Sequence, residues 1–146
     1  MIRILVTGSE SFIGKELITI FKKRKLFVYG IDRYKKTSFT NKSIDINSKK
    51  INDIIYNYKI NTIIHLAAIS RDADCKRNIL LTFKSNVLGT LNLIEIAKKN
   101  KIKNFIFASS EWVYDSFENK KEKKESDIIN IKKITSEYAL SKLVSE

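Results

Sequence analysis

The sequence has no proline, a single cysteine and only four glycines among its 146 residues. The lone thiol, Cys75, cannot close an internal disulfide, so the disulfide-stabilised secreted class is excluded. No apolar run is long enough to cross a bilayer, and the chain opens on a strand-like segment rather than a signal peptide. We therefore expect a cytoplasmic protein with no membrane partner, built as one domain with its own core.

Arginine is also scarce, because only five of the 28 basic residues are arginines. The net charge of +12 suggests a nucleic-acid partner, but proteins that read bases and phosphates favour the bidentate guanidinium of arginine. The lysines are spread over most of the chain, and abundant isoleucine, lysine and asparagine are typical of AT-rich coding. We interpret the charge mainly as a solvated surface that slightly favours anionic ligands, and we do not expect a nucleic-acid partner.

The first fourteen residues carry the most informative pattern of the chain. Residues 2–6 are mostly apolar, as in a buried strand, and residues 12–24 have the pattern of a helix. Between them, Gly8 permits a tight turn and Gly14 lets the helix pack close to the sheet, so the helix N-terminus can face a pyrophosphate. Asp32 follows the next strand, 24 residues after Gly8, where a carboxylate binds a ribose 2′-hydroxyl. Together the two glycines, the helix N-terminus and Asp32 predict a dinucleotide-binding site. The alternative is an ordinary strand-to-helix turn that happens to contain two glycines.

Strand-like and helix-like segments alternate along the chain. The expected strands are 2–6, 26–31, 43–46, 60–66 and 103–108, and the expected helices are 12–24, 48–58, 75–99 and 135–146. This alternation predicts an α/β fold of the Rossmann type, a doubly wound parallel sheet with helices on both faces. The charge run 118–125 has no structural period and is expected to be an exposed loop.

The longest expected helix, 75–99, shows apolar residues at three- and four-residue steps. This stripe is expected to be buried, and it consists of Ile79, Phe83, Val87, Leu91 and Ile94. Leu80, Leu88 and Ile96 lie off the stripe, so we expect a second covered face, in contact with another subunit. Gly89 stands in mid-helix at a cost of ~1 kcal/mol against alanine, which close packing would explain.

Ligands of a doubly wound sheet bind where the strands end, so residues after each strand are candidate site residues. Ala67 and Ala68 follow the fourth strand and are small enough to let backbone lie against a flat ligand. His65, the only histidine, is more typical of a hydrogen-bonded core residue than of a base. Ser110 follows the fifth strand.

Tyr138 and Lys142 are four residues apart in the last helix and so project from the same face. A nearby ammonium favours phenolate, so we expect Lys142 to lower the pKa of Tyr138. A tyrosine tuned in this way can act as a general base on a substrate hydroxyl, and Ser110 can bind the same oxygen. Taken alone, the pair is equally typical of an exposed amphipathic helix.

In this order, the motifs resemble the N-terminal part of an extended short-chain dehydrogenase/reductase, the NAD-dependent epimerase/dehydratase family that acts on nucleotide sugars. The resemblance covers essentially the whole chain, and it rests on residues 7–14, Asp32, Asp45, 65–68, 86–90, 109–114 and 138–142.

The resemblance implies NAD as cofactor, a nucleotide-sugar substrate and no metal. Tyr138 would be the catalytic base, Lys142 would tune it and hold the nicotinamide ribose, and Ser110 would orient the sugar hydroxyl. A homodimer would form through the long helix and the Tyr138 helix. The implied cofactor-binding residues are Gly8, Ser11, Phe12, Ile13 and Gly14 at the pyrophosphate, Asp32 and Arg33 at the adenosine ribose, Asp45 and Ile46 at the adenine, and Leu66, Ala67, Ala68, Asn86, Tyr138 and Lys142.

The chain departs from the family pattern in several places. Ser11 replaces the usual middle glycine, and Asp115 replaces the glycine after Val-Tyr. Glu111 and Trp112 stand where dehydratases of the family have an acidic pair, so dehydration is disfavoured. The Asp32 carboxylate favours binding of NAD over NADP. The neighbouring Arg33 argues against this preference, because an arginine there can bind the 2′-phosphate of NADP.

The chain ends shortly after Lys142, so we expect one incomplete domain, 1–146, truncated at its C-terminus and lacking the substrate domain. The resulting hypothesis is the NAD-binding part of a nucleotide-sugar epimerase or reductase that is inactive alone. The alternative is a catalytically silent fragment of the same fold that binds a cofactor or a polyanion.

Overall fold

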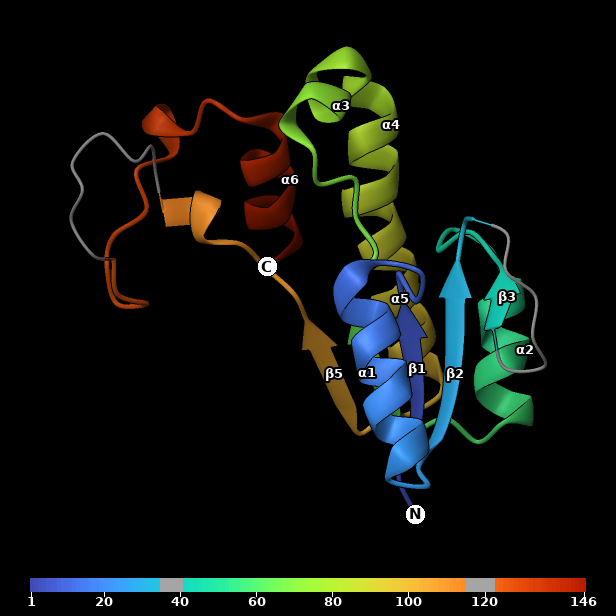
Figure 1. Cartoon of the computed structure of the whole chain (residues 1–146). Coiled ribbons are helices and arrows are strands. Elements are labelled where there is room, and N and C mark those ends of the chain that lie inside the picture. The colour runs from blue at the N-terminus through green and yellow to red at the C-terminus, as the bar shows by residue number, and fades with distance from the viewer. Residues whose placement is uncertain (35–40, 115–122) are drawn as a thin grey trace.

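The computed structural model describes residues 1–34, 41–114 and 123–146, and their strands form one parallel sheet (Figure 1). The sheet has the strand order β3-β2-β1-β4-β5, so the chain steps outward from β1 in both directions. This order confirms the predicted doubly wound α/β fold. The strands are β1 (Arg3–Thr7), β2 (Phe27–Asp32), β3 (Asn41–Ser43), β4 (Thr62–His65) and β5 (Asn104–Phe107).

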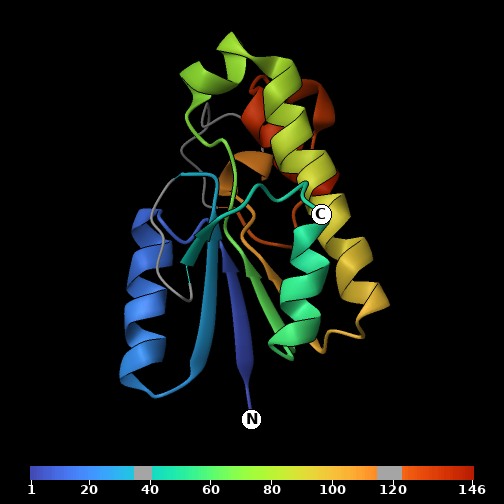
Figure 2. The ribbon, with the colours of Figure 1, turned by 90° about the vertical axis from the view of Figure 1, so that its right-hand side faces the viewer.

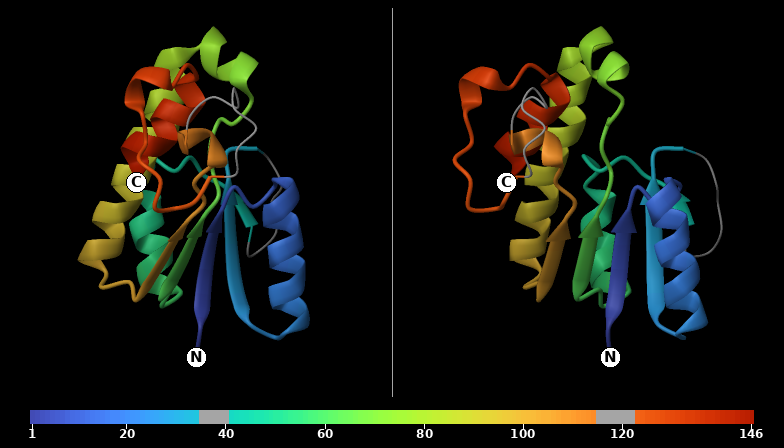
Figure 3. Two further views of the ribbon diagram at one scale, coloured as in Figure 1. Left: turned by 90° about the vertical axis from the view of Figure 1, so that its left-hand side faces the viewer. Right: turned by 60° about the vertical axis from the view of Figure 1, so that its left-hand side comes forward.

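Helices cover both faces of the sheet (Figures 2 and 3). On one face α1 (Phe12–Lys23) buries Ile18 against Val6 and Ile64. On the other face α2 (Lys50–Asn57) and α5 (Gly89–Lys99) pack on a larger apolar cluster, whose fully buried members are Leu5, Ile31, Ile51, Ile55, Ile63 and Leu93. The strands are apolar on both sides because each face has its own helix layer.

The strand register brings the candidate residues to one edge. Thr7 of β1 is level with Ile31 of β2 and with His65 of β4. The residues that follow these positions therefore meet at the carboxyl edge between β1 and β4, the point at which the chain direction across the sheet reverses.

The predicted continuous helix over 75–99 is wrong at its start. The chain forms α3 (Asp72–Arg77), breaks at Asn78, and resumes as α4 (Ile79–Phe83), a π-helical turn η1 (Lys84–Leu88) and α5. Asn78 has an extended backbone, with φ −143° and ψ 80°, and its side chain accepts the Leu81 amide at 2.9 Å. An asparagine that caps the following helix explains the break.

The predicted buried stripe of this segment is also wrong. Ile79, Leu91 and Ile94 are exposed to 50%, 51% and 41%, and Phe83 and Val87 are half-buried. The inward side of this segment carries the buried residues Thr82, Asn86, Gly89, Thr90, Leu93, Ile96 and Ala97. The apolar periodicity of the sequence does not reveal this side, because three of its buried residues, Thr82, Asn86 and Thr90, are polar and have hydrogen-bonded side chains.

Gly89 confirms the predicted close packing, because a Cβ there would collide with the side chain of Ile46.

The third strand was predicted at 43–46 but is Asn41–Ser43, since Asp45 accepts the Asn47 amide at 2.8 Å and turns the chain out of the sheet. The helix η2 (Glu111–Tyr114) follows β5, η4 (Ile131–Lys133) follows later, and α6 (Glu137–Ser145) ends the chain. Asp115 and most of the charge run lie outside the described residues.

Contrary to the expectation from the sequence, one helical stretch, Ile79–Lys99, is long and apolar enough to cross a membrane by length and composition. Leu93, Ile96 and Ala97 of this stretch are buried against the sheet, as in a core helix of a globular domain.

Candidate functional site

The turn between β1 and α1 has the geometry that its glycines predicted. Gly8 has φ +69°, and a Cβ there would lie 2.9 Å from the backbone nitrogen of Ala67. A Cβ on Gly14 would collide with the carbonyl oxygen of Gly8. The two glycines therefore let the turn approach the segment after β4 and let α1 start directly above it.

The amide groups of this turn leave two donors for a ligand. Four amides are used inside the protein: Ser9 binds Ile31 O at 3.2 Å, Glu10 binds Asp32 Oδ2 at 2.9 Å, Ser11 binds Gly8 O at 3.0 Å and Gly14 binds Ser11 Oγ at 3.1 Å. The amides of Phe12 and Ile13, the first two residues of α1, make no hydrogen bond to any described residue. They sit at the positive end of the helix dipole, which suits an anion such as pyrophosphate.

Asp32 lies at the end of β2 and is held by backbone on both oxygens. Oδ2 accepts the Glu10 amide, and Oδ1 accepts the Tyr34 amide at 3.1 Å. Each carboxylate oxygen keeps a further lone pair, so the fixed group remains an acceptor for a ribose hydroxyl.

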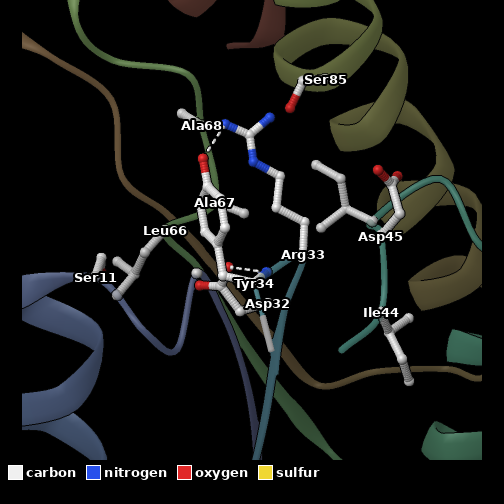
Figure 4. Close-up of a pocket in the computed structure, with 12 residues that line it drawn as sticks. Ser11, Asp32, Arg33, Tyr34, Ile44, Asp45, Leu66, Ala67, Ala68 and Ser85 are labelled. Atoms are coloured by element: carbon white, nitrogen blue, oxygen red, sulfur yellow. Dashed lines mark hydrogen bonds between the residues drawn. The ribbon is translucent and has the colours of Figure 1, made fainter. Parts of the chain in front are cut away.

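A cavity of about 140 Å³ opens beside Asp32 (Figure 4). Its size suits one part of a dinucleotide, because whole-ligand pockets are usually ~300 Å³ or larger. The predicted residues that line it are Gly8, Ser11, Asp32, Arg33, Asp45, Ile46, Leu66, Ala67 and Ala68.

Sequence reasoning missed Tyr34, Ile44 and Ser85 in this lining. Figure 4 shows the Arg33 side chain extending across the cavity toward Ala68 and Ser85. Its Nη2 donates to Tyr34 Oη at 3.1 Å. The only available signals were that Ser85 precedes Asn86 of the 86–90 motif and that Tyr34 follows Asp32 closely.

His65 is buried and hydrogen-bonded on both ring nitrogens, as the sequence indicated. Nδ1 lies 2.7 Å from Thr7 Oγ1, and Nε2 lies 2.9 Å from Thr90 Oγ1. Thr90 donates its own proton to Asn86 O at 2.5 Å, so it accepts from Nε2–H, and Thr7 donates to Nδ1. Burial, and then the positive charge of Lys142, lower the pKa of His65 to about 3. The ring is therefore neutral and structural, not a base.

Asn86 lies away from the cavity, although it was predicted to bind cofactor. Its buried amide holds both backbone groups of Ile69, at 2.8 Å and 3.0 Å, and Nδ2 also donates to Ser141 Oγ at 2.9 Å. Asn86 thus joins the segment after β4 to α6, and it positions the helix that carries Tyr138 and Lys142.

Ser110, Tyr138 and Lys142 form a second cluster at the same edge of the sheet. The Ser110 side chain lies close enough to Tyr138 to lower the pKa of its phenol through hydrogen bonding, although burial outweighs this effect. Lys142 is 3% exposed, its Nζ donates to Ala108 O at 2.6 Å, and it lies 6.0 Å from the centre of the Tyr138 ring. Burial lowers the pKa of Lys142 to about 8, against a smaller opposing effect of Glu146.

The expectation that Lys142 lowers the pKa of Tyr138 is wrong for this structure. Burial raises the pKa of Tyr138, and the nearby Glu111 carboxylate raises it further, while the Ser110 hydrogen bond opposes them. The ammonium is directed at Ala108 O and at the Phe107 ring, 4.5 Å away, so it does not offset burial of the phenol. The phenol is therefore protonated at neutral pH.

These features define a dinucleotide-binding protein of the Rossmann type: a doubly wound sheet, a glycine-containing turn after the first strand, free amides at a helix N-terminus and an aspartate at a strand end. The profile of the NAD dependent epimerase/dehydratase family matches residues 4–146, and the chain belongs to that family.

Named relatives are similar over most of this chain. Bifunctional protein GAL10 of Candida maltosa is 28% identical over an alignment of 126 residues that covers 75% of this chain and 82% of that protein. The dTDP-D-glucose 4,6-dehydratase of Dictyostelium discoideum is 33% identical over an alignment of 133 residues that covers 78% of this chain but 30% of that protein. The solved structure of MoeE5 in complex with UDP-glucose and NAD has a TM-score of 0.86 and 28% identity, and it covers 98% of this chain and 46% of its own. The chain thus spans less than half of the dehydratase and of MoeE5.

Proposed function

We propose that this chain binds NAD along its carboxyl edge and forms the cofactor-binding half of a nucleotide-sugar epimerase or reductase. The observation that carries the proposal is the pair of unused amides, Phe12 and Ile13, at the N-terminus of α1, directly after the turn whose Glu10 amide binds Asp32. The amides would hold the pyrophosphate, and Asp32 would accept from the adenosine ribose. The cavity between Asp45 and Ala68 would take the adenine.

The second cluster supplies the proton chemistry. Bound NAD would exchange a hydride with a sugar carbon, which is the chemistry the cofactor brings. Ser110 and Tyr138 would share the sugar oxygen, and Tyr138 would pass a proton to or from it. Because the phenol is protonated in this structure, the cluster is set to donate a proton to a carbonyl oxygen, the direction of reduction. Of the two positions directly after Ser110, only Glu111 is acidic and Trp112 is not, so water elimination is not proposed.

The same proposal includes a second copy of the chain. The outward side of α4, η1 and α5 exposes Leu80 to 80%, Leu88 to 55% and Leu91 to 51%. Val144 of α6 is exposed to 56%. Isolated exposed leucines are ordinary, but a row along one helix marks an interaction site. Pairing of the two long helices, with the Tyr138 helix beside them, would cover this row.

Calorimetric titration tests the cofactor assignment. We expect the wild-type chain to bind NAD at least tenfold more tightly than NADP, because the Asp32 carboxylate would accept a 2′-hydroxyl but repel a 2′-phosphate. Asp32→Ala should lose about tenfold in NAD affinity and lose most of the preference. Equal or tighter binding of NADP by the wild type would contradict the assignment, and Arg33 would then be the residue to examine.

A further inference from the structure

The edge of the sheet opposite the cavity is basic. At this edge α1, α2 and α5 end and turn into β2, β4 and β5 (Figure 1). We define the basic edge as nine exposed residues of these turns: Lys22, Lys23, Arg24, Lys25, Lys59, Lys98, Lys99, Lys101 and Lys103.

The net charge of the chain is concentrated in these turns. They hold nine of the 28 basic residues and none of the 16 acidic ones within 21–26, 57–61 and 97–104, so they account for nine of the twelve net positive charges. The lysines are spread over the chain, as the sequence suggested, but the excess of positive charge is not.

The strand register places the three turns side by side. Arg3 pairs with Phe27, Ile4 with Thr62, and Thr62 with Asn104, so β1, β2, β4 and β5 start at nearly the same level. Asn61 joins the turns directly, since its amide donates to Arg3 O at 3.0 Å and its carbonyl accepts the Lys103 amide at 3.1 Å. Neighbouring strands are ~4.8 Å apart, so the edge from β2 to β5 spans ~14 Å. About four phosphates of one nucleic-acid strand occupy that length.

The charge of the basic edge is not neutralised within the described parts of the chain. The ion pairs found there involve Lys15, Lys76 and Arg77, and none involves the basic edge. The C-terminal dipoles of α1, α2 and α5 offset only ~0.5 charge each. The surface therefore keeps a strong positive potential.

We propose that the basic edge binds the phosphate backbone of a nucleic acid without sequence preference. A row of ammonium groups matches a row of phosphates, and lysine contacts of this kind give affinity rather than base recognition. The apolar residues inside the turns, Leu26, Ile60 and Ile102, are buried or half-buried, and Met1 and Ile2 at the start of the chain are exposed apolar side chains beside the turns. Because the cavity lies at the opposite edge, nucleic acid and NAD would bind together.

Fluorescence anisotropy with a labelled oligouridine of about 20 nucleotides, at about 50 mM and about 200 mM salt, tests the proposal. The test variant carries Lys23→Gln, Lys59→Gln, Lys99→Gln and Lys103→Gln. We expect it to lose at least tenfold in affinity at the lower salt. The slope of log affinity against log salt should fall by about 0.7 for each removed phosphate contact. NAD should not displace the probe from the wild type.

The matched control carries Lys49→Gln, Lys50→Gln, Lys123→Gln and Lys124→Gln, which remove the same charge from exposed positions elsewhere. It should bind nearly as well as the wild type, and thermal melts verify that both variants fold. Equal losses in the two variants would show diffuse attraction and overturn the proposal. Absence of oligouridine binding by the wild type at the lower salt would overturn it too, and so would displacement by NAD. The last measurement tests binding of the chain to vesicles that contain anionic lipid. Binding to the vesicles but not to oligouridine would assign the basic edge to a membrane surface instead.

Discussion

Ser11 is the residue at which this chain departs most directly from the glycine pattern of its family. Its Oγ accepts the Gly14 amide at 3.1 Å and caps α1, and the same residue lines the cavity. The hydroxyl thus occupies a helix-terminal amide that a phosphate oxygen would otherwise meet.

We therefore expect Ser11→Gly to bind NAD several-fold more tightly while the chain without cofactor loses only ~0.3 kcal/mol of stability, because glycine is itself a tolerated N-cap residue. Ser11→Ala should lose the cap as well but keep its Cβ in the cavity, so its NAD affinity should lie between the two. Calorimetry and chemical denaturation measure both effects. Weaker NAD binding by Ser11→Gly would show that the serine hydroxyl helps the pyrophosphate instead of competing with it.

The neutral His65 predicts an acid-sensitive fold. Its pKa is about 3 in the folded chain, against ~6.5 when unfolded. Between these values the unfolded state binds more protons, so stability must fall as pH drops below ~6.5, by ~1 kcal/mol for each pH unit. Denaturation from pH 7 to pH 4 measures the slope, and the histidine-free variant His65→Gln should show a shallower one. Nitrogen chemical shifts that place the proton on Nδ1, or a ring charged at pH 5, would contradict this account.

At the scale of elements, the row of leucines along the long helix predicts association. Leu80→Glu combined with Leu91→Glu should keep the fold, because both side chains are exposed, and should turn a dimer into a monomer. Analytical ultracentrifugation measures the mass. Lys98→Glu with Lys99→Glu, at the far end of the same helix, is the control and should leave the mass unchanged. A wild type that is monomeric at high concentration would remove the basis for the dimer.

The elements also show which information the sequence contains. The strands 2–6, 26–31 and 60–66 were predicted because strands buried on both faces are continuous apolar runs. The phase of the long helix was not predicted, because Asn86 and Thr90 are polar residues whose buried partners lie far away in sequence: Ile69 and Ser141 for Asn86, and His65 for Thr90. The raised pKa of Tyr138 was missed for a similar reason, since burial of the phenol depends on tertiary packing. The position of the Arg33 side chain across the cavity was also not predicted, because the fold determines it and the neighbouring residues in the sequence do not.

At the scale of the whole molecule, we predict that this chain binds NAD but turns over no nucleotide sugar. The strands of the described residues form one sheet, and the chain covers 46% of MoeE5. A sugar that is not held within ~1 Å of its reacting position loses ~100-fold in rate. Assays with NAD and a panel of UDP-, GDP- and dTDP-sugars should detect no product. Turnover that disappears in Tyr138→Phe would contradict this prediction and support the proton role of Tyr138.

The π-helical turn η1 constrains how this chain can change by insertion and deletion. A π turn holds about one residue more than an α turn, and one residue corresponds to ~100° of rotation along an α-helix. Loss of one residue from Lys84–Leu88 would restore a regular helix but rotate α4 relative to α5. Leu93 and Ile96 would stay in the core, while Asn86 would swing away from Ile69. A one-residue deletion at this point would therefore leave a folded domain in which Asn86 no longer holds α6 in place. The fold would tolerate such a deletion, whereas the site that contains Tyr138 and Lys142 would not.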